Sequence, residues 1–126
     1  MKIKKGMAVD WKVVNDLKAQ VGEEVLSGLY TLFIADINNH LEACRTALEK
    51  GDLEDLAENA HRMKGGAGSL GCHRVKDLAA VLQDEAERQA ADPVLRGMIR
   101  SLAGACEAAR IEVAQIIDPP ILEATG

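Results

Sequence analysis

Apolar side chains recur at steps of three and four along most of the chain, which is the spacing of one face of an α-helix. The longest such series predicts an amphipathic helix that ends at Lys50 and Gly51. Its apolar positions are Leu26, Leu29, Phe33, Ile37, Leu41, Cys44 and Leu48. A shorter helix, Trp11–Val21, is predicted before it, with Asp10 as the N-cap and Gly22 as the interruption.

Three further helices are predicted in the second half of the chain. Asp52 can cap the first of them, which ends near Gly71, and the next runs to about Gln89. The last begins at Asp92-Pro93 and is stopped by Asp118-Pro119-Pro120. Their apolar positions are Leu53, Leu56, Ala60, Met63, Ala67 and Leu70, then Val75, Leu78, Leu82 and Ala86, and finally Leu95, Met98, Leu102, Cys106, Ala109, Val113 and Ile116.

No segment alternates with period two over a useful length, so the pattern gives no support for a β-sheet. Hydrophobic residues make up 48% of the chain but aromatic residues only 2%, which favours close-packed helices. The predicted fold class is all-α: an antiparallel up-and-down four-helix bundle with a short additional N-terminal helix covering one end. The length of 126 residues fits a single domain, with flexible ends expected at 1–9 and 119–126.

Charge and cysteine content narrow the class of partner. A net charge of −5 disfavours binding to the phosphate backbone of nucleic acid. No apolar run approaches the roughly 18 residues that a membrane-spanning helix needs. Cys44, Cys72 and Cys106 are widely scattered and form no C-x-x-C pair, which is typical of reduced thiols. We expect a cytoplasmic monomer that binds neither nucleic acid nor a membrane.

The segment from His61 to Gly71 departs from the composition of an ordinary helix. Its glycines are Gly65, Gly66, Gly68 and Gly71. The three interior ones together cost roughly 2–3 kcal/mol relative to alanine, which suggests that there is a reason for them. At about 100° per residue, Lys64, Gly65 and Gly68 project within roughly 60°, 40° and 20° of the histidine. The histidine is therefore predicted to stand above bare backbone, with a lysine one turn along.

His61 is the candidate chemical group. It lies beside the buried stripe, so its ring can pack on one side while one nitrogen faces solvent. Bare backbone at Gly65 and Gly68 would admit another protein, and Lys64 offers a cation to a phosphoryl group. Two plainer interpretations remain open. His61 can be an ordinary histidine at the edge of the core. The glycines can instead serve close packing between helices, above all Gly66 and Gly71, which point away from His61.

Two known phosphate-binding motifs can be compared with the same segment. The stretch from Gly66 to Gly71 matches G-x-G-x-x-G, but that fingerprint needs a preceding strand, and here a helix precedes it. The pattern G-x-x-x-x-G-K-[ST] is absent. The sequence therefore predicts a protein without an ATP site of its own.

The segment resembles the central helix of the histidine-containing phosphotransfer (HPt) domains of bacterial multistep phosphorelays, which reads approximately H-x-L-K-G-x-A-x-x-x-G. The matching residues are His61, Lys64, Gly65, Ala67 and Gly71. Met63 stands where leucine is usual, a change that conserves volume on the buried stripe. The motif covers about a dozen residues, and the helical pattern fits the family over nearly the whole chain.

The resemblance implies a phosphocarrier rather than an enzyme. It implies that His61 accepts a phosphoryl group at Nε2 from an aspartyl phosphate on one receiver domain and passes it to an aspartate on another. The expected partners are receiver domains of response regulators and hybrid histidine kinases. The resemblance also implies that Mg²⁺ belongs to the partner receiver domain, so no cofactor or metal is expected on this chain.

Other polar residues are weaker candidates for phosphate or partner binding. The family often places a polar side chain of the next helix near the phosphorylated ring, and by spacing Gln83 is the candidate, although an exposed helical glutamine is an equal alternative. Four residues on or beside the histidine face could touch a receiver, although such charges are commonly just solvated: Glu54, Glu58, Arg62 and Ser69.

The remaining histidines and aromatic residues are interpreted as structural. His40 and His73 have no partners at metal-ligand spacing and are treated as structural or solvated. Trp11 and Phe33 are predicted core anchors, and Tyr30 a boundary residue.

Two other functions compete with the phosphocarrier. One is a helical adaptor bundle that binds signalling proteins without turning over phosphate. The other, ranked last, is a phosphate- or nucleotide-binding enzyme, which would rest on the glycine run alone and lacks a general base or paired carboxylates beside it.

Overall fold

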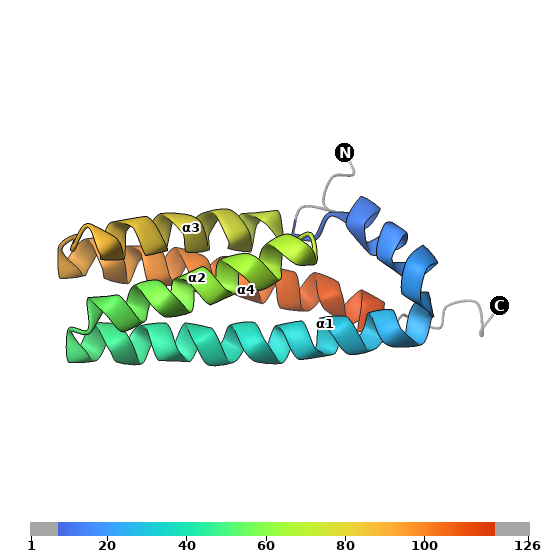
Figure 1. Cartoon of the computed structure of the whole chain (residues 1–126), viewed down its shortest axis with the longest axis horizontal. Helices are drawn as coiled ribbons and strands as arrows, with labels where there is room; N and C mark the ends of the chain where they lie inside the picture. The colour runs from blue at the N-terminus through green and yellow to red at the C-terminus, as the bar shows by residue number, and fades with distance from the viewer. Residues whose placement is uncertain (1–7, 118–126) are drawn as a thin grey trace.

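A computed structural model describes residues 8–117, which form four α-helices (Figure 1). The helices are α1 (Trp11–Lys50), α2 (Leu53–Ser69), α3 (His73–Glu87) and α4 (Asp92–Ile117). No strand occurs within this range, which confirms the all-α prediction. None of the described helices is both long and apolar enough to cross a membrane.

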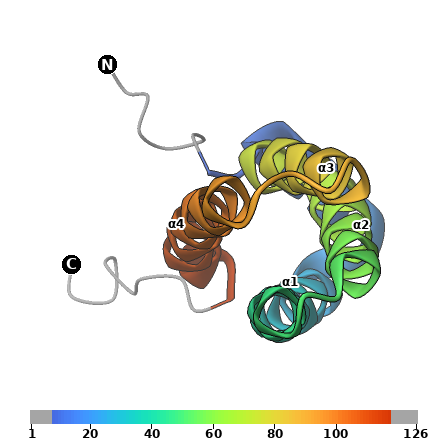
Figure 2. The same ribbon diagram turned by 90° about the vertical axis from the view of Figure 1, so that its left-hand side faces the viewer.

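The helices pack as a bundle in which each one touches two neighbours. Helix α1 packs against α2 and α4, and α3 packs against the same two helices. Seen end-on, the four helices follow one another around the core in chain order (Figure 2). The loops between them are only two to four residues long, so consecutive helices run antiparallel. This arrangement confirms the predicted up-and-down bundle.

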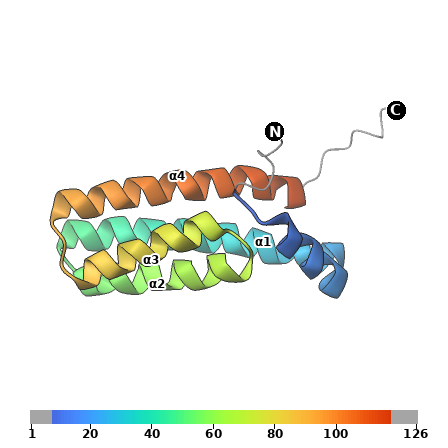
Figure 3. The same ribbon diagram turned by 90° about the horizontal axis from the view of Figure 1, so that it is seen from above.

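Helix α1 consists of two helical parts joined at Gly22. This glycine has φ 86° and ψ 166°, values that are not helical and that a residue with a side chain rarely adopts. The segment Trp11–Val21 therefore turns away from the rest of α1 and lies at one end of the bundle (Figure 3). The predicted short first helix and its interruption are both confirmed.

The chain before α1 is tied to the bundle. Val9 is only 1% exposed, and the backbone N–H of Ala8 donates to Glu112 Oε1 at 3.2 Å. Trp11 Nε1 also donates to the carboxylate of Glu112 on α4. A flexible end was expected through residue 9, but burial and these bonds hold residues 8 and 9 in place. Residues 1–7 and 118–126, including the expected stop at 118–120, lie outside the described part.

The ends of the helices follow the predicted capping residues. Gly51 ends α1 in the left-handed conformation, with φ 70°, and the side chain of Asp52 accepts from the N–H of Asp55 at the start of α2. Gly71 also has a positive φ, 78°, and a Cβ there would stand 3.0 Å from Val13 Cβ. The α2–α3 turn therefore requires glycine both for its conformation and for contact with the N-terminal segment.

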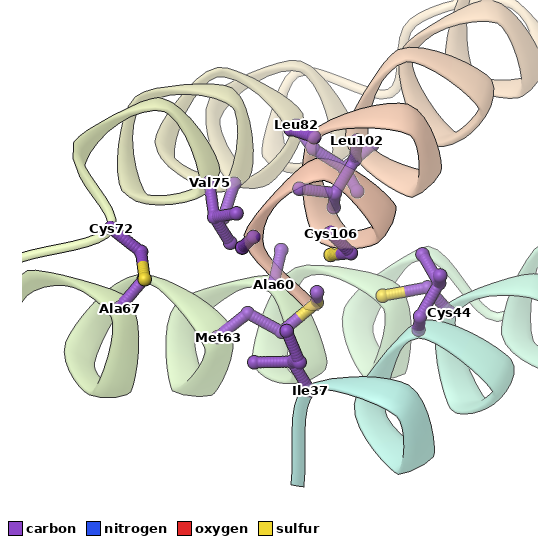
Figure 4. Packing of buried hydrophobic residues seen from close by; sticks show 14 of the residues in the cluster. Ile37, Cys44, Ala60, Met63, Ala67, Cys72, Val75, Leu82, Leu102 and Cys106 are labelled. Carbon is purple, nitrogen blue, oxygen red and sulfur yellow. The ribbon is translucent and has the colours of Figure 1, made fainter. Parts of the chain in front are cut away.

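The apolar stripes meet in one core (Figure 4). Met63 and Ala60 of α2 point inward among side chains of the other helices, such as Ile37. Tyr30 was expected at the boundary but is completely buried, because its hydroxyl can donate to the carbonyl of Leu70 at 2.7 Å. Tyr30 and Phe33 are the aromatic residues of this buried cluster, so aromatic rings are few, as the composition indicated.

The three cysteines lie in this core as free thiols. Burial raises the pKa of Cys44 and Cys72 to about 12 and that of Cys106 to about 11. Such thiols carry almost no thiolate at neutral pH and act as small apolar side chains.

Candidate functional site

The packing of α2 sets the position of His61. Ala60 and Met63 on either side of it are buried, whereas His61 itself is exposed. At the helical repeat, one face of α2 enters the core and the adjacent flank faces both solvent and α3. The histidine ring is therefore available at the surface while its backbone is held by a buried stripe.

Gln83 of α3 lies beside the histidine ring. Its Oε1 is 3.4 Å from His61 Nδ1, and its Nε2 donates to Glu87 Oε2 at 3.1 Å. Gln83 and Glu87 are one turn apart on α3, so both face α2 at this level. The structure thus brings together the histidine and the glutamine that the spacing suggested.

A groove of about 720 Å³ runs between α2 and α3 next to this pair. His61 and Gln83 contribute to its wall, and three carboxylate side chains, those of Glu54, Glu58 and Glu87, line the same groove. The surface on this side of the ring is therefore acidic.

The glycines of α2 differ in their surroundings. A Cβ at Gly65 would meet no atom within 4 Å, whereas one at Gly66 would lie 3.7 Å from the ring of Phe33. A Cβ at Gly68 would approach Lys76 Cδ at 3.2 Å. The prediction of bare backbone therefore holds at Gly65 but is wrong at Gly68, where the stem of a lysine from α3 covers the helix.

The charged residues around His61 are arranged in two ways. Arg62 and Glu58 form an exposed i,i+4 ion pair, with Arg62 Nη2 3.0 Å from Glu58 Oε2. Lys64 is half-buried and makes no ion pair with any residue in the described range 8–117. Within this range, its ammonium group is therefore a cation without an ion-pair partner, one turn from the histidine.

Two residues beside the site were missed in the sequence. Lys76 was missed because its contact with Gly68 depends on how α2 and α3 align, which no local pattern reveals. Glu87 could have been found, because a carboxylate four residues after a candidate glutamine lies on the same helix face.

Ser69, a candidate for partner contact, donates to the carbonyl of Gly65 at 3.2 Å.

The other two histidines have structural partners. His40 Nδ1 lies 3.1 Å from Oδ1 of the buried Asn59, and His73 Nε2 lies 3.0 Å from Asp10 Oδ2. The hydrogen bond from His73 lowers the pKa of Asp10 below its usual value. Within residues 8–117, no three His, Cys, Asp or Glu side chains gather in a way that could hold a metal ion.

Comparison with known proteins gives one family. The family model of the Hpt domain matches residues 28–115, well over half of the chain. A similar solved structure is that of histidine-containing phosphotransfer protein B (HptB) from Pseudomonas aeruginosa PAO1, with 23% sequence identity and a TM-score of 0.62. The match covers 88% of this chain and 89% of that one, which supports the same fold. A search of curated protein sequences found no match.

Proposed function

The chain belongs to the Hpt domain family, and on that premise we propose that it is a phosphorelay intermediate in which His61 carries the phosphoryl group. The donor is an aspartyl phosphate of one receiver domain, and the acceptor is an aspartate of another. Within the family match, His61 begins the motif that Lys64, Gly65 and Ala67 continue along α2.

The observation that carries this proposal is that His61 is exposed while its Nδ1 contacts Gln83. Nδ1 lies 3.4 Å from Gln83 Oε1, and with this oxygen toward the ring the proton of the neutral imidazole belongs on Nδ1. Nε2 then keeps its lone pair, on a side chain that is exposed. A neutral imidazole with a free nitrogen is a competent nucleophile near pH 7.

The transfer step needs little from this chain beyond that nitrogen. The lone pair of Nε2 forms the new N–P bond, the P–O bond to the partner's aspartate breaks, and its electron pair stays on the carboxylate oxygen. The proton on Nδ1 remains in place and donates to Gln83 while the ring becomes positive. Alignment and neutralisation of charge dominate such reactions, and Mg²⁺ of the receiver supplies much of the latter.

Lys64 and Gly65 complete the surface that the partner meets. Lys64, with no ion pair among the described residues, is free to approach the phosphoryl oxygens after transfer. Gly65 leaves open space one turn from the ring, so the receiver can bring its aspartate close. The exposed ion pair of Arg62 and Glu58 is proposed as a rim contact with the same partner.

The proposal is tested by mixing the protein with a receiver domain that carries an aspartyl phosphate. We expect the protein to acquire a phosphate that is labile in acid and stable in alkali, and to lose this capacity in His61→Gln. His73→Gln, which replaces another exposed histidine, is the control and is expected to accept phosphate normally.

Undiminished phosphorylation of His61→Gln would overturn the assignment. Binding of the receiver without any phosphate on the wild-type protein would instead favour the adaptor function.

A further inference from the structure

The side chain of Gln83 could face His61 in either of two ways. A primary amide has an oxygen that accepts and an NH₂ group that donates, and the two ends have nearly the same shape. With Oε1 toward the ring, Nδ1 must carry the proton and Nε2 is free. With NH₂ toward the ring, Nδ1 must accept, so the proton moves to Nε2 and blocks the proposed nucleophile. Gln83 alone does not choose between these states.

Glu87 distinguishes the two orientations. An ionised carboxylate accepts hydrogen bonds and cannot donate them. Glu87 Oε2 lies 3.1 Å from Gln83 Nε2, so it binds the NH₂ end of the amide and leaves Oε1 toward His61 Nδ1. Reversing the amide would set its oxygen against a carboxylate oxygen, which is repulsive. The chain of contacts therefore runs from Glu87 through Gln83 to the ring.

From these contacts we infer that Glu87 is a positioning residue that sets the tautomer of His61. It binds the amide of Gln83 and acts through the orientation of that side chain. Its carboxylate keeps the proton on Nδ1 and the lone pair on Nε2. The consequence for phosphotransfer rests on the function proposed above, whereas the tautomer itself is a property of this chain alone.

The helix geometry favours this role over a solvated carboxylate. Glu87 is the last residue of α3 and lies four positions after Gln83, a spacing at which helical side chains meet. Both also line the groove beside His61, so the three side chains share one surface. A carboxylate at 84, 85 or 88 would project from other sides of the helix.

Two substitutions of Glu87 test the inference by changing whether residue 87 can donate a hydrogen bond to Gln83 or accept one from it. Glu87→Gln replaces the carboxylate by a group that both donates and accepts, so we expect His61 to show a mixture of the two tautomers. Glu87→Lys replaces it by a group that only donates. Lysine would bind the oxygen of Gln83, turn NH₂ toward the ring and place the proton on Nε2.

The measurement is the pair of ¹⁵N chemical shifts of the His61 ring, recorded by NMR at a pH where the ring is neutral. In the wild-type protein we expect a protonated-type shift at Nδ1 and a lone-pair-type shift at Nε2. Both shifts should move to intermediate values in Glu87→Gln and exchange places in Glu87→Lys. Asp84→Asn and Asp84→Lys are matched controls, because Asp84 is exposed next to Gln83 and the charge changes are the same. The controls should keep the wild-type shifts.

Unchanged shifts in both Glu87 variants would overturn the inference, as would equal changes in the Asp84 controls. Transfer rates provide a second readout: we expect Glu87→Lys to slow transfer about tenfold, by analogy with the loss of the outer hydrogen-bond partner of a metal-binding histidine. Changed shifts without phosphorylation of the wild-type protein would support the role of Glu87 and reject the proposed function. Normal phosphorylation with unchanged shifts would support the proposed function and reject the role of Glu87.

Discussion

At the scale of single residues, His61 depends on neighbours that differ in kind. Gln83 contacts the ring directly, Lys64 offers charge, and Gly65 contributes by having no side chain. Each of these contributions can be removed separately, because none of the three residues belongs to the buried core. Their effects on transfer should therefore appear without loss of the fold.

Gly65 is expected to be needed for docking of the receiver domain, whereas the fold does not require a glycine at this position. Its Cβ position is open, so Gly65→Ala should raise the free energy of unfolding by about 0.5–1 kcal/mol through helix propensity. Gly65→Gln should fold equally well but slow phosphotransfer, because the longer side chain occupies the space that a receiver needs. Gly104→Gln, at an equally open position on α4, is the control for a surface glutamine. Equal transfer rates in the two glutamine variants would contradict the steric role.

Lys64 is expected to have a modest effect. Lys64→Ala should slow transfer about threefold, which corresponds to the loss of about 0.6 kcal/mol from one charge contact near the surface. Because screening by salt weakens such contacts, the difference from the wild-type protein should shrink as ionic strength rises. Stopped-flow assays at two salt concentrations would measure the difference in transfer rate between the two proteins. A difference that does not depend on salt would argue against an electrostatic role of Lys64.

At the scale of helices and turns, the α2–α3 turn fixes both the site and the N-terminal segment. The backbone N–H of Asp10 donates to the carbonyl of Gly71 at 2.8 Å, and Tyr30 of α1 binds the neighbouring carbonyl of Leu70. Gly71 also lies against Val13. The turn that ends the histidine helix is thus held by contacts from a distant part of the sequence.

A comparison of two glycines isolates this contact. Gly51 and Gly71 both have positive φ, but only Gly71 would bring a Cβ against neighbouring atoms. Gly51→Ala should therefore cost about 1–2 kcal/mol, the conformational penalty alone. Gly71→Ala should cost more, because Val13 and Asp10 must also shift. Urea denaturation measures both variants, and equal losses would show that the N-terminal segment packs loosely on the turn.

The hydrogen bond between His73 and Asp10 predicts a pH dependence of stability. The hydrogen bond from His73 lowers the folded-state pKa of Asp10 below its ordinary value of 3.8. A carboxyl whose pKa is lowered on folding stabilises the protein above the unfolded pKa, and this contribution is lost as pH falls through the folded value. At neutral pH the free energy of unfolding of the wild-type protein should therefore be higher than that of Asp10→Asn. This difference should disappear in acid. A difference that grows as the pH falls below 3.8 would contradict this linkage.

At the scale of the whole molecule, the sequence predicts the scaffold better than the site. Helix ends were predictable because caps such as Asp52 and breaks such as Gly22 are local signals. The burial of Tyr30 was missed because its partner, the carbonyl of Leu70, is forty residues away. Contacts across the α2–α3 interface, such as that of Lys76 with Gly68, depend on helix register, which a single sequence does not contain.

The buried cysteines offer a test of the bundle as one cooperative unit. All three thiols lie in the core, and burial raises their pKa to about 11 or 12. A thiol reagent should therefore label them only when the bundle opens, at one common rate that rises with urea as global unfolding does. Labelling of one cysteine far ahead of the others in the absence of urea would show that part of the bundle opens independently.

The central claim is that Nε2 of His61 carries the phosphoryl group. NMR of the ¹⁵N-labelled protein, phosphorylated by a receiver domain, tests it most directly through coupling between phosphorus and the ring nitrogens. We predict coupling at His61 Nε2, with Nδ1 still protonated against Gln83. Phosphate on Nδ1 or on another residue, or no phosphate at all, would contradict the account.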